Sequence, residues 1–210
     1  MLKKLCIAGL FMTFSTIIYS QDISFGPKLG LNYSNISGHQ TDGFSPRIGF
    51  NAGFMAEFSL TDKFSIQPEV LYSTQGADAE DDYFAYYEIL QLGNVQVKTD
   101  YINVPVLAEY YITPNLSVQL GPQVGFLVNS ALELDLEYEG EQEFRSNGLE
   151  NQLHKVDFAI SGGFEYALDS GIFFDIRYNL GMTDFVLAPD GGLQGNNKNR
   201  VVQLSAGYSF

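Results

Sequence analysis

Apolar residues alternate with polar or small residues along most of the chain after Ile23, and this period of two restricts the fold more than any other feature. Such alternation places one set of side chains on each face of a β-strand. It recurs in eight segments, at roughly 23–34, 46–60, 64–75, 100–112, 116–132, 155–168, 171–182 and 200–210. The chain is therefore predicted to be all-β, with eight strands.

The connections between these segments alternate between short and long. Three are tight turns, at 61–63, 113–115 and 169–171, and four are long, at 35–45, 76–99, 133–154 and 183–199. An up-and-down meander with this order places every long loop at one end, as in outer-membrane barrels. A soluble lipocalin-like ligand-binding barrel, which also has eight strands, is the structural alternative.

The composition of the two strand faces separates these alternatives. The polar face is rich in glycine, which has little purpose on a solvated strand but fits the narrow lumen of an eight-stranded barrel. Charged residues make up only 17% of the chain, against about a quarter in typical soluble domains. The predicted fold is an eight-stranded antiparallel up-and-down transmembrane β-barrel with short periplasmic turns and long extracellular loops. Aromatic residues near both strand ends predict two interfacial girdles.

The first twenty residues have the pattern of a secretory signal peptide. Lys3 and Lys4 precede an apolar stretch of 14 residues that ends before small and polar residues. We therefore expect residues 1–20 to be cleaved and 21–210 to form the barrel domain. Cys6 lies within the apolar stretch, so the mature chain would lack cysteine, disulfides and cysteine-based metal or redox sites.

Several short motifs and the final aromatic strand resemble a known family. The motifs are Gly26-Pro27-Lys28-Leu29-Gly30-Leu31-Asn32, Gln67-Pro68-Glu69-Val70-Leu71-Tyr72, Tyr101-Ile102-Asn103-Val104-Pro105-Val106-Leu107, Gly121-Pro122-Gln123-Val124-Gly125 and Ile176-Arg177-Tyr178-Asn179-Leu180-Gly181. In this order the mature chain resembles the PorT-like outer-membrane β-barrel proteins of Bacteroidota, often labelled "porin family". The resemblance implies a bacterial outer-membrane location and carries no catalytic motif. The terminal residues Tyr208 and Phe210 are expected to serve as an assembly signal for the barrel assembly machinery.

Nine ionisable residues share the parity of the polar face and are predicted to line the lumen. They are Lys28, Arg47, Glu57, Glu69, Glu109, Asp157, Glu165, Asp175 and Arg177. Their distances from the turn centres suggest an acidic belt near the short-turn end with cations just above it. An unpaired, desolvated charge in a narrow lumen costs roughly several kcal/mol of free energy, so these groups should pair or be neutralised. A salt-bridged plug and a proton- or cation-binding lumen both fit this pattern.

Acidic residues also gather in the long connections. They are Asp78, Glu80, Asp81 and Asp82 in one connection, and Glu133, Asp135, Glu137 and Glu139 in another. In the second set the acids alternate with leucines, so the fifth strand is expected to continue beyond the membrane as a hairpin. This surface is a candidate for binding divalent cations or an envelope protein partner, while a merely solvated face is the plainer interpretation. EF-hand spacing is missing, and no metal site or other cofactor is predicted.

The remaining predictions concern the class of function. A net charge of −14 argues against nucleic-acid binding, and side chains fill an eight-stranded lumen, so no open diffusion pore is expected. Hydrolase motifs are missing, and the sequence predicts no enzyme; a rim enzyme using His39 or His154 is a distant alternative. The leading hypothesis is a monomeric outer-membrane protein of structural or binding type, surrounded by outer-membrane lipid. An accessory subunit of an envelope or secretion complex is the second.

Overall fold

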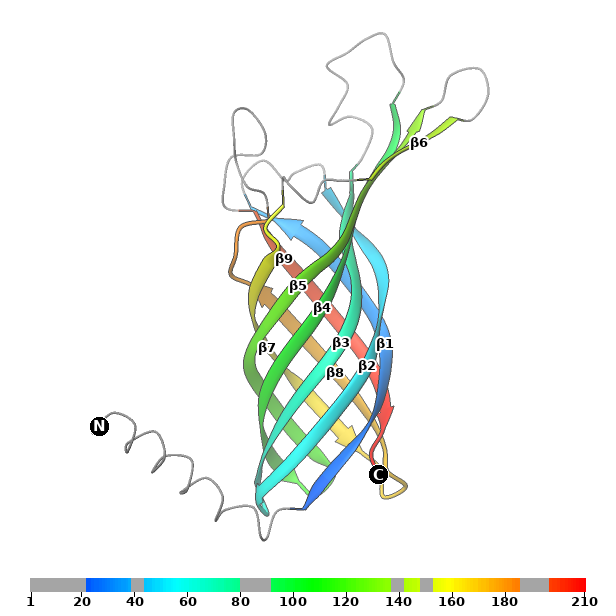
Figure 1. Cartoon of the computed structure of the whole chain (residues 1–210). Helices are drawn as coiled ribbons and strands as arrows, with labels where there is room; N and C mark the ends of the chain where they lie inside the picture. Colours follow the sequence, from blue (N-terminus) through cyan, green and yellow to red (C-terminus); the bar gives the residue numbers. More distant parts are fainter. Residues whose placement is uncertain (1–21, 39–43, 80–91, 137–141, 148–152, 186–196) are drawn as a thin grey trace, which may run out of the picture.

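The chain forms a closed antiparallel β-barrel (Figure 1). The computed structural model describes residues 22–38, 44–79, 92–136, 142–147, 153–185 and 197–210. The strands are β1 (Ile23–Ser37), β2 (Phe44–Thr61), β3 (Phe64–Ala79), β4 (Leu92–Thr113), β5 (Leu116–Leu136), β6 (Gln142–Asn147), β7 (Val156–Ala167), β8 (Ile172–Gly181) and β9 (Lys198–Tyr208). The sheet order is β4-β3-β2-β1-β9-β8-β7-β5-β6, and an additional β4–β5 pairing closes the ring. The predicted eight-stranded barrel is thereby confirmed, with β6 as an added strand outside the ring.

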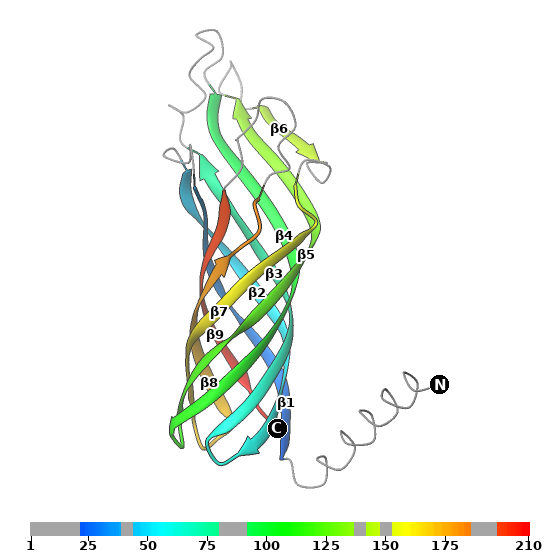
Figure 2. The same ribbon diagram turned by 90° about the vertical axis from the view of Figure 1, so that its left-hand side faces the viewer.

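The short turns lie at one end of the barrel and the strand ends that flank the long connections lie at the other, as the sequence predicted (Figures 1 and 2). The turns after β2, β4 and β7 lie at the end where the C-terminus is found (Figures 1 and 2). Within the described residues, no helix is long and apolar enough to cross a membrane. The predicted signal peptide, residues 1–20, lies outside the described residues.

The outer surface of the barrel is apolar and the inner surface is polar. In β2, Phe54 is 69% exposed on the outside, whereas the next residue, Met55, is 3% exposed on the inside. Aromatic rings meet at the short-turn end, where Phe64 and Tyr110 have ring centroids 5.1 Å apart. An exposed apolar band that surrounds a polar interior is the arrangement that a barrel needs in lipid.

Glycines on the inner face permit close approach of neighbouring strands. A Cβ atom added to Gly53 would lie 2.0 Å from the backbone oxygen of Val70. One added to Gly163 would lie 2.1 Å from the oxygen of Ile176 and 2.9 Å from Cγ of Arg177. The sequence argument attributed these glycines to lumen space alone. The structure shows that they also relieve contacts between the backbones of strongly curved strands.

Several strands extend further toward the long-loop end than predicted. β4 begins at Leu92 rather than at residue 100, and β3 continues to Ala79 rather than to 75. The added parts pair with each other, with Ala79 opposite Val95. Asp78 therefore lies in a strand and not in a loop, because backbone pairing continues beyond the point where clear alternation ends.

The pairing of β4 with β5 is irregular near Asp100, and the extra residue lies in β5. Asp100 is opposite Asn129 and Tyr101 is opposite Leu127, which leaves Val128 without a partner in β4. A single added residue reverses the faces of a strand. Above this bulge, Ser130 faces inward with Thr99, so Leu132 no longer continues the apolar outer face.

The predicted hairpin extension of the fifth strand is also confirmed. β5 continues to Leu136 and pairs with β6, from Leu136 opposite Gln142 to Ala131 opposite Asn147. This hairpin projects beyond the barrel at the long-loop end (Figure 1).

Candidate functional site

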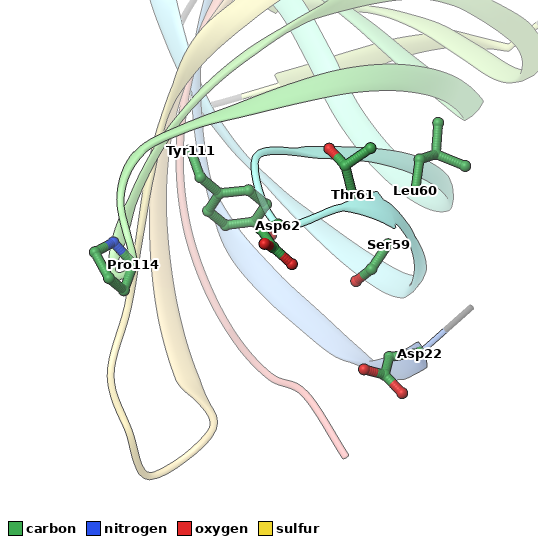
Figure 3. Close-up of a pocket in the computed structure, with 7 residues that line it drawn as sticks. All are labelled: Asp22, Ser59, Leu60, Thr61, Asp62, Tyr111 and Pro114. Atoms are coloured by element: carbon green, nitrogen blue, oxygen red, sulfur yellow. The ribbon is translucent and has the colours of Figure 1, made fainter. Parts of the chain in front are cut away.

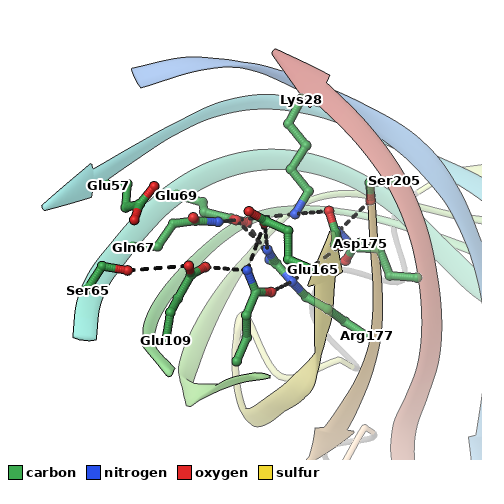
Figure 4. A network of polar contacts seen from close by, with 12 residues as sticks. Lys28, Glu57, Ser65, Gln67, Glu69, Glu109, Glu165, Asp175, Arg177 and Ser205 are labelled. Carbon is green, nitrogen blue, oxygen red and sulfur yellow. Dashed lines mark hydrogen bonds and ion pairs between the residues drawn. The ribbon is translucent and has the colours of Figure 1, made fainter. Parts of the chain in front are cut away.

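Four charged side chains form the centre of the lumen in the half near the short turns (Figure 4). Lys28 of β1 lies 3.2 Å from Oε1 of Glu69 and 2.8 Å from Oδ2 of Asp175. The Arg177 guanidinium donates to both carboxylate oxygens of Glu69, at 2.7 and 2.8 Å, and its Nε lies 3.3 Å from Oδ1 of Asp175. The side chains of all four are at most 1% exposed. This charged quartet joins β1, β3 and β8 through the interior.

Gln119 of β5 extends the quartet toward further carboxyl groups. Its Oε1 accepts a hydrogen bond from Nε of Arg177 at 2.6 Å, and its Nε2 donates to Oε2 of Glu165 at 2.8 Å. The same nitrogen also donates to Oε1 of Glu109. One amide side chain therefore connects the quartet with two more acids, on β7 and β4.

Tyr111 and Ser65 continue this connection toward the short-turn end. Oγ of Ser65 and the Tyr111 hydroxyl each lie 3.3 Å from Oε2 of Glu109. The Tyr111 hydroxyl also contacts Oε1 of Glu57. Glu57 thus joins the network at its outer end, next to the short turns.

Two of the nine predicted lumen residues lie apart from this network. Arg47 donates to the backbone oxygen of Gln75 at 2.8 Å, toward the long-loop end of β2. Asp157, near the start of β7, accepts a hydrogen bond from Nδ2 of Asn199 at 3.2 Å. The structure brings together the other seven: Lys28, Glu57, Glu69, Glu109, Glu165, Asp175 and Arg177.

Neutral amides and hydroxyls fill the lumen above the quartet. Nδ2 of Asn32 lies 2.9 Å from Oγ of Ser73 and 3.0 Å from the oxygens of Phe50 and Thr74. Its Oδ1 accepts a hydrogen bond from Asn51 at 2.9 Å. Sequence reasoning selected only charged residues and missed this layer, although these amides have the same parity.

An apolar cluster lies at the long-loop end of the lumen. Ile36 and Ala77, from β1 and β3, pack with Leu153 and Phe185, which lie outside the strands. Phe44, Val97 and Leu127 pack against this group. We call these seven residues the apolar cap. Sequence reasoning missed it, because Leu153 and Phe185 lie in connections that show no alternation.

An open pocket lies at the opposite end, among the short turns (Figure 3). Its volume is about 640 Å³, and its lining includes Asp22, Asp62, Pro114 and Tyr111. Tyr111 therefore lies between this pocket and the carboxyl groups of Glu57 and Glu109. The pocket was not expected from the sequence.

Two of the predicted acids of the long connections have described side chains, and both lie near cations. Asp78 lies beyond the roughly ten strand residues that cross a bilayer. Burial raises the pKa of its carboxyl group, against the opposing effect of Arg47 and Lys98. Glu133 forms an ion pair with Lys98. The structure does not describe the side chain of Asp135, and five other acids lie outside the described residues: Glu80, Asp81, Asp82, Glu137 and Glu139.

Among the described residues, no group of three or more His, Cys, Asp or Glu side chains is placed to hold a metal ion. His154 is described and donates its backbone N–H to the oxygen of Phe185 at 3.3 Å, while His39 lies outside the described residues.

The predicted assembly signal lies on the outer surface at the short-turn end. Tyr208 and Phe210 are exposed, and their ring centroids lie 4.8 Å apart. Phe210 also contacts Phe25, with centroids 5.8 Å apart. The aromatic C-terminus is thus placed next to β1, and its role in assembly stays a prediction.

Comparisons with known proteins give one family and a set of similar structures. The family model described as outer membrane protein beta-barrel domain matches residues 19–186. Neisserial surface protein A is similar in structure, with a TM-score of 0.53 and 12% identity, over 89% of this chain and 97% of that one. A major outer membrane protein from Thermus thermophilus has a TM-score of 0.53 and 12% identity, over 90% of this chain and 100% of that one. No curated protein matches the chain in sequence.

Proposed function

Because the chain belongs to the outer membrane protein beta-barrel domain family, we propose that it is a structural or binding protein with a packed, salt-bridged lumen. The protein lies in the bacterial outer membrane, with its short turns in the periplasm and its long loops outside the cell. Family membership and the apolar outer face exclude the soluble lipocalin-like alternative. In this proposal the protein is a monomer and is not an open diffusion pore.

The charged quartet is the observation that supports a packed lumen most strongly. Its buried side chains extend from β1, β3 and β8 to meet inside the barrel. Eight strands enclose a space that side chains fill, whereas aqueous channels need about sixteen strands. The apolar cap packs at the other end of the same space. A molecular ligand or a protein partner would therefore bind outside the lumen.

We place the binding surface on the extracellular connections. Twelve of the 25 acidic residues lie in 78–88 and 133–150, and the net charge is −14. Such a surface attracts positively charged groups, either divalent cations or a basic region of an envelope protein. Asp78 and Glu133 are already near cations, so binding would rest on the other acids.

A pull-down with two charge variants tests this proposal. The first variant combines Asp135→Asn, Glu137→Gln and Glu139→Gln, and the second, as a control, combines Asp62→Asn and Asp169→Asn in the periplasmic turns. Tagged full-length protein is cross-linked in intact cells and purified in detergent. We expect a partner to co-purify with the wild type and the control but not with the first variant. No partner at all, or equal recovery from both variants, would contradict binding of a basic protein region and leave divalent cations as the bound group.

A second candidate is an accessory subunit of an envelope or secretion complex. It rests on motifs such as Gly26–Asn32 and Gln67–Tyr72, which resemble those of PorT-like proteins. This candidate also assumes that the chain is related to proteins of Bacteroidota. A subunit should recover its partner in a fixed stoichiometry, whereas a loop-bound ligand should not. The stoichiometry of the purified complex therefore separates the two candidates.

The proposed function includes no catalysis. A rim enzyme would depend on His39 or His154, which are the only histidines of the chain. Replacing both by Ala should leave partner recovery and envelope integrity unchanged. A loss of either in the double variant would favour the enzymatic alternative.

A further inference from the structure

The periplasmic half of the lumen contains more carboxyl groups than its cations can balance. Lys28 and Arg177 pair with Glu69 and Asp175 at 2.7 to 3.3 Å, which makes the charged quartet neutral. Glu57, Glu109 and Glu165 follow in the same network, where Arg177 approaches Glu165 only to 3.9 Å. If all five carboxyl groups were ionised, the two cations would leave a net charge of −3 inside the barrel.

The groups around these three acids offer little further compensation. Glu109 has two neighbours of like charge, Glu57 of β2 and Glu165 of β7. Its favourable partners are Arg177 of β8, Ser65 of β3, Gln119 of β5 and Tyr111. Glu165 faces Glu109 and Asp175 as like charges, and Lys28 and Arg177 as opposite charges. Burying a carboxylate without its own cation costs roughly several kcal/mol of folding free energy, and binding a proton removes this cost.

The hydrogen bonds at Tyr111 also call for an added proton. Its hydroxyl contacts Oε1 of Glu57 and Oε2 of Glu109. A phenol has one hydrogen and can donate to only one of these oxygens. The second contact is a hydrogen bond only if that carboxyl group is itself the donor. Glu57 and Glu109 are thus placed to share a proton through Tyr111.

Gln67 gives an independent sign that a donor is missing. Its side chain, fully buried on β3, points into the cluster beside Glu69 (Figure 4). Its Nε2 donates to Oε1 of Glu69 at 2.8 Å, but its Oε1 has no hydrogen-bond partner within the described part of the chain. Buried amide oxygens are normally satisfied. Ionised carboxylates accept hydrogen bonds and cannot donate to this oxygen, whereas a protonated carboxyl group can.

We propose that Glu57, Glu109 and Glu165 form a proton-binding site that exchanges with the periplasm past Tyr111. Each binding event takes one proton from water and forms one carboxylic O–H bond; no other group changes. Tyr111 lines the open periplasmic pocket on one side and contacts two of the three acids on the other (Figure 3). Protonation of these acids lowers the excess negative charge in the periplasmic half of the lumen.

Infrared spectroscopy of the full-length protein in detergent tests this site directly. A protonated carboxyl group has a carbonyl-stretch band that an ionised carboxylate lacks. At neutral pH we expect this band in the wild type, a weaker band in Glu109→Gln and Glu165→Gln, and an unchanged band in Glu133→Gln. The last variant is the matched control, because Glu133 is paired with Lys98 outside the lumen. A missing band, or one of equal strength in all variants, would overturn the proposal.

The pH dependence of unfolding supplies a second readout that does not rely on a spectral assignment. If the folded barrel holds protons that the unfolded chain has released, its stability must fall as pH rises from about 5 to about 8. Glu109→Gln should flatten this dependence, and Glu133→Gln should not. If Na⁺ or K⁺ instead stabilised the protein more than choline at equal ionic strength, a metal cation would fill the site and the proposal would be wrong.

Discussion

The periplasmic and extracellular halves of the lumen are lined by the same strands but filled with different chemistry. The periplasmic half contains the charged quartet, whose members come from β1, β3 and β8. The extracellular half contains neutral amides such as Asn32 and Asn51, and above them the apolar cap. Breaking one charge pair leaves a buried charge, whereas losing an amide or a methyl group leaves only a polar atom or a small cavity. The periplasmic half should therefore be the more sensitive of the two.

The largest effect is expected from Arg177→Ala. It leaves Glu69 and Asp175 with Lys28 as their only close cation among the described residues, so we expect a loss of about 3–5 kcal/mol in the free energy of unfolding. Denaturant-induced unfolding in phospholipid vesicles measures this loss. Arg200→Ala is the matched control, since Arg200 donates to the backbone oxygens of Gly181 and Asn199 at 2.9 and 3.0 Å. Equal losses for both variants would remove the special role of the quartet.

A smaller loss is expected in the neutral layer, from Asn32→Ala. This substitution removes the amide that lies within 3.0 Å of three acceptors and should cost about 2 kcal/mol. Asn129→Ala serves as its control, because Asn129 is exposed and bonds Asp100 at 3.0 Å. The comparison between the two halves fails if Asn32→Ala destabilises the barrel more than Arg177→Ala does.

The apolar cap should respond still less to a small change. Ile36 is 1% exposed within the cap, and Ile36→Val should cost about 1 kcal/mol in the same unfolding assay. Ile48→Val, at a lipid-facing position that is 71% exposed, should change stability by less than about 0.5 kcal/mol. A larger effect at Ile48 than at Ile36 would mean that the cap is not packed as described.

The smallest effect is expected at the rim ion pair of Lys98 and Glu133. Both side chains are 28% exposed, so Lys98→Met should cost about 0.5 kcal/mol at low salt. High salt screens such exposed pairs, and at about 1 M the difference from wild type should disappear. The loss caused by Arg177→Ala should persist at the same salt concentration. A loss at Arg177 that high salt abolishes would show that the quartet is solvated.

Much of the barrel could be predicted from the sequence because lipid and lumen impose opposite chemistry on alternate residues. The outward position of Phe54 and the inward position of Met55 follow from parity alone. Parity also selected Glu69 and Arg177 as lumen residues. It could not reveal that they meet, because they are 108 positions apart and their contact depends on the stagger of all the strands between them.

The features that the sequence concealed are those that interrupt alternation. Val97 is an apolar residue on the inner face of β4, where it belongs to the apolar cap. A break lies at Val128 in β5, where one extra residue reverses the strand faces. Phe185 and Leu153 complete the cap from outside the strands, where no periodicity identifies a buried residue.

Single-channel recording tests the central claim, a lumen that side chains fill from the charged quartet to the apolar cap. Purified full-length protein is reconstituted into planar bilayers and held at a range of voltages. The packed lumen predicts little or no conductance, and refolding is checked by heat-modifiable migration on a gel. Steady, large channels from correctly folded protein would contradict the account.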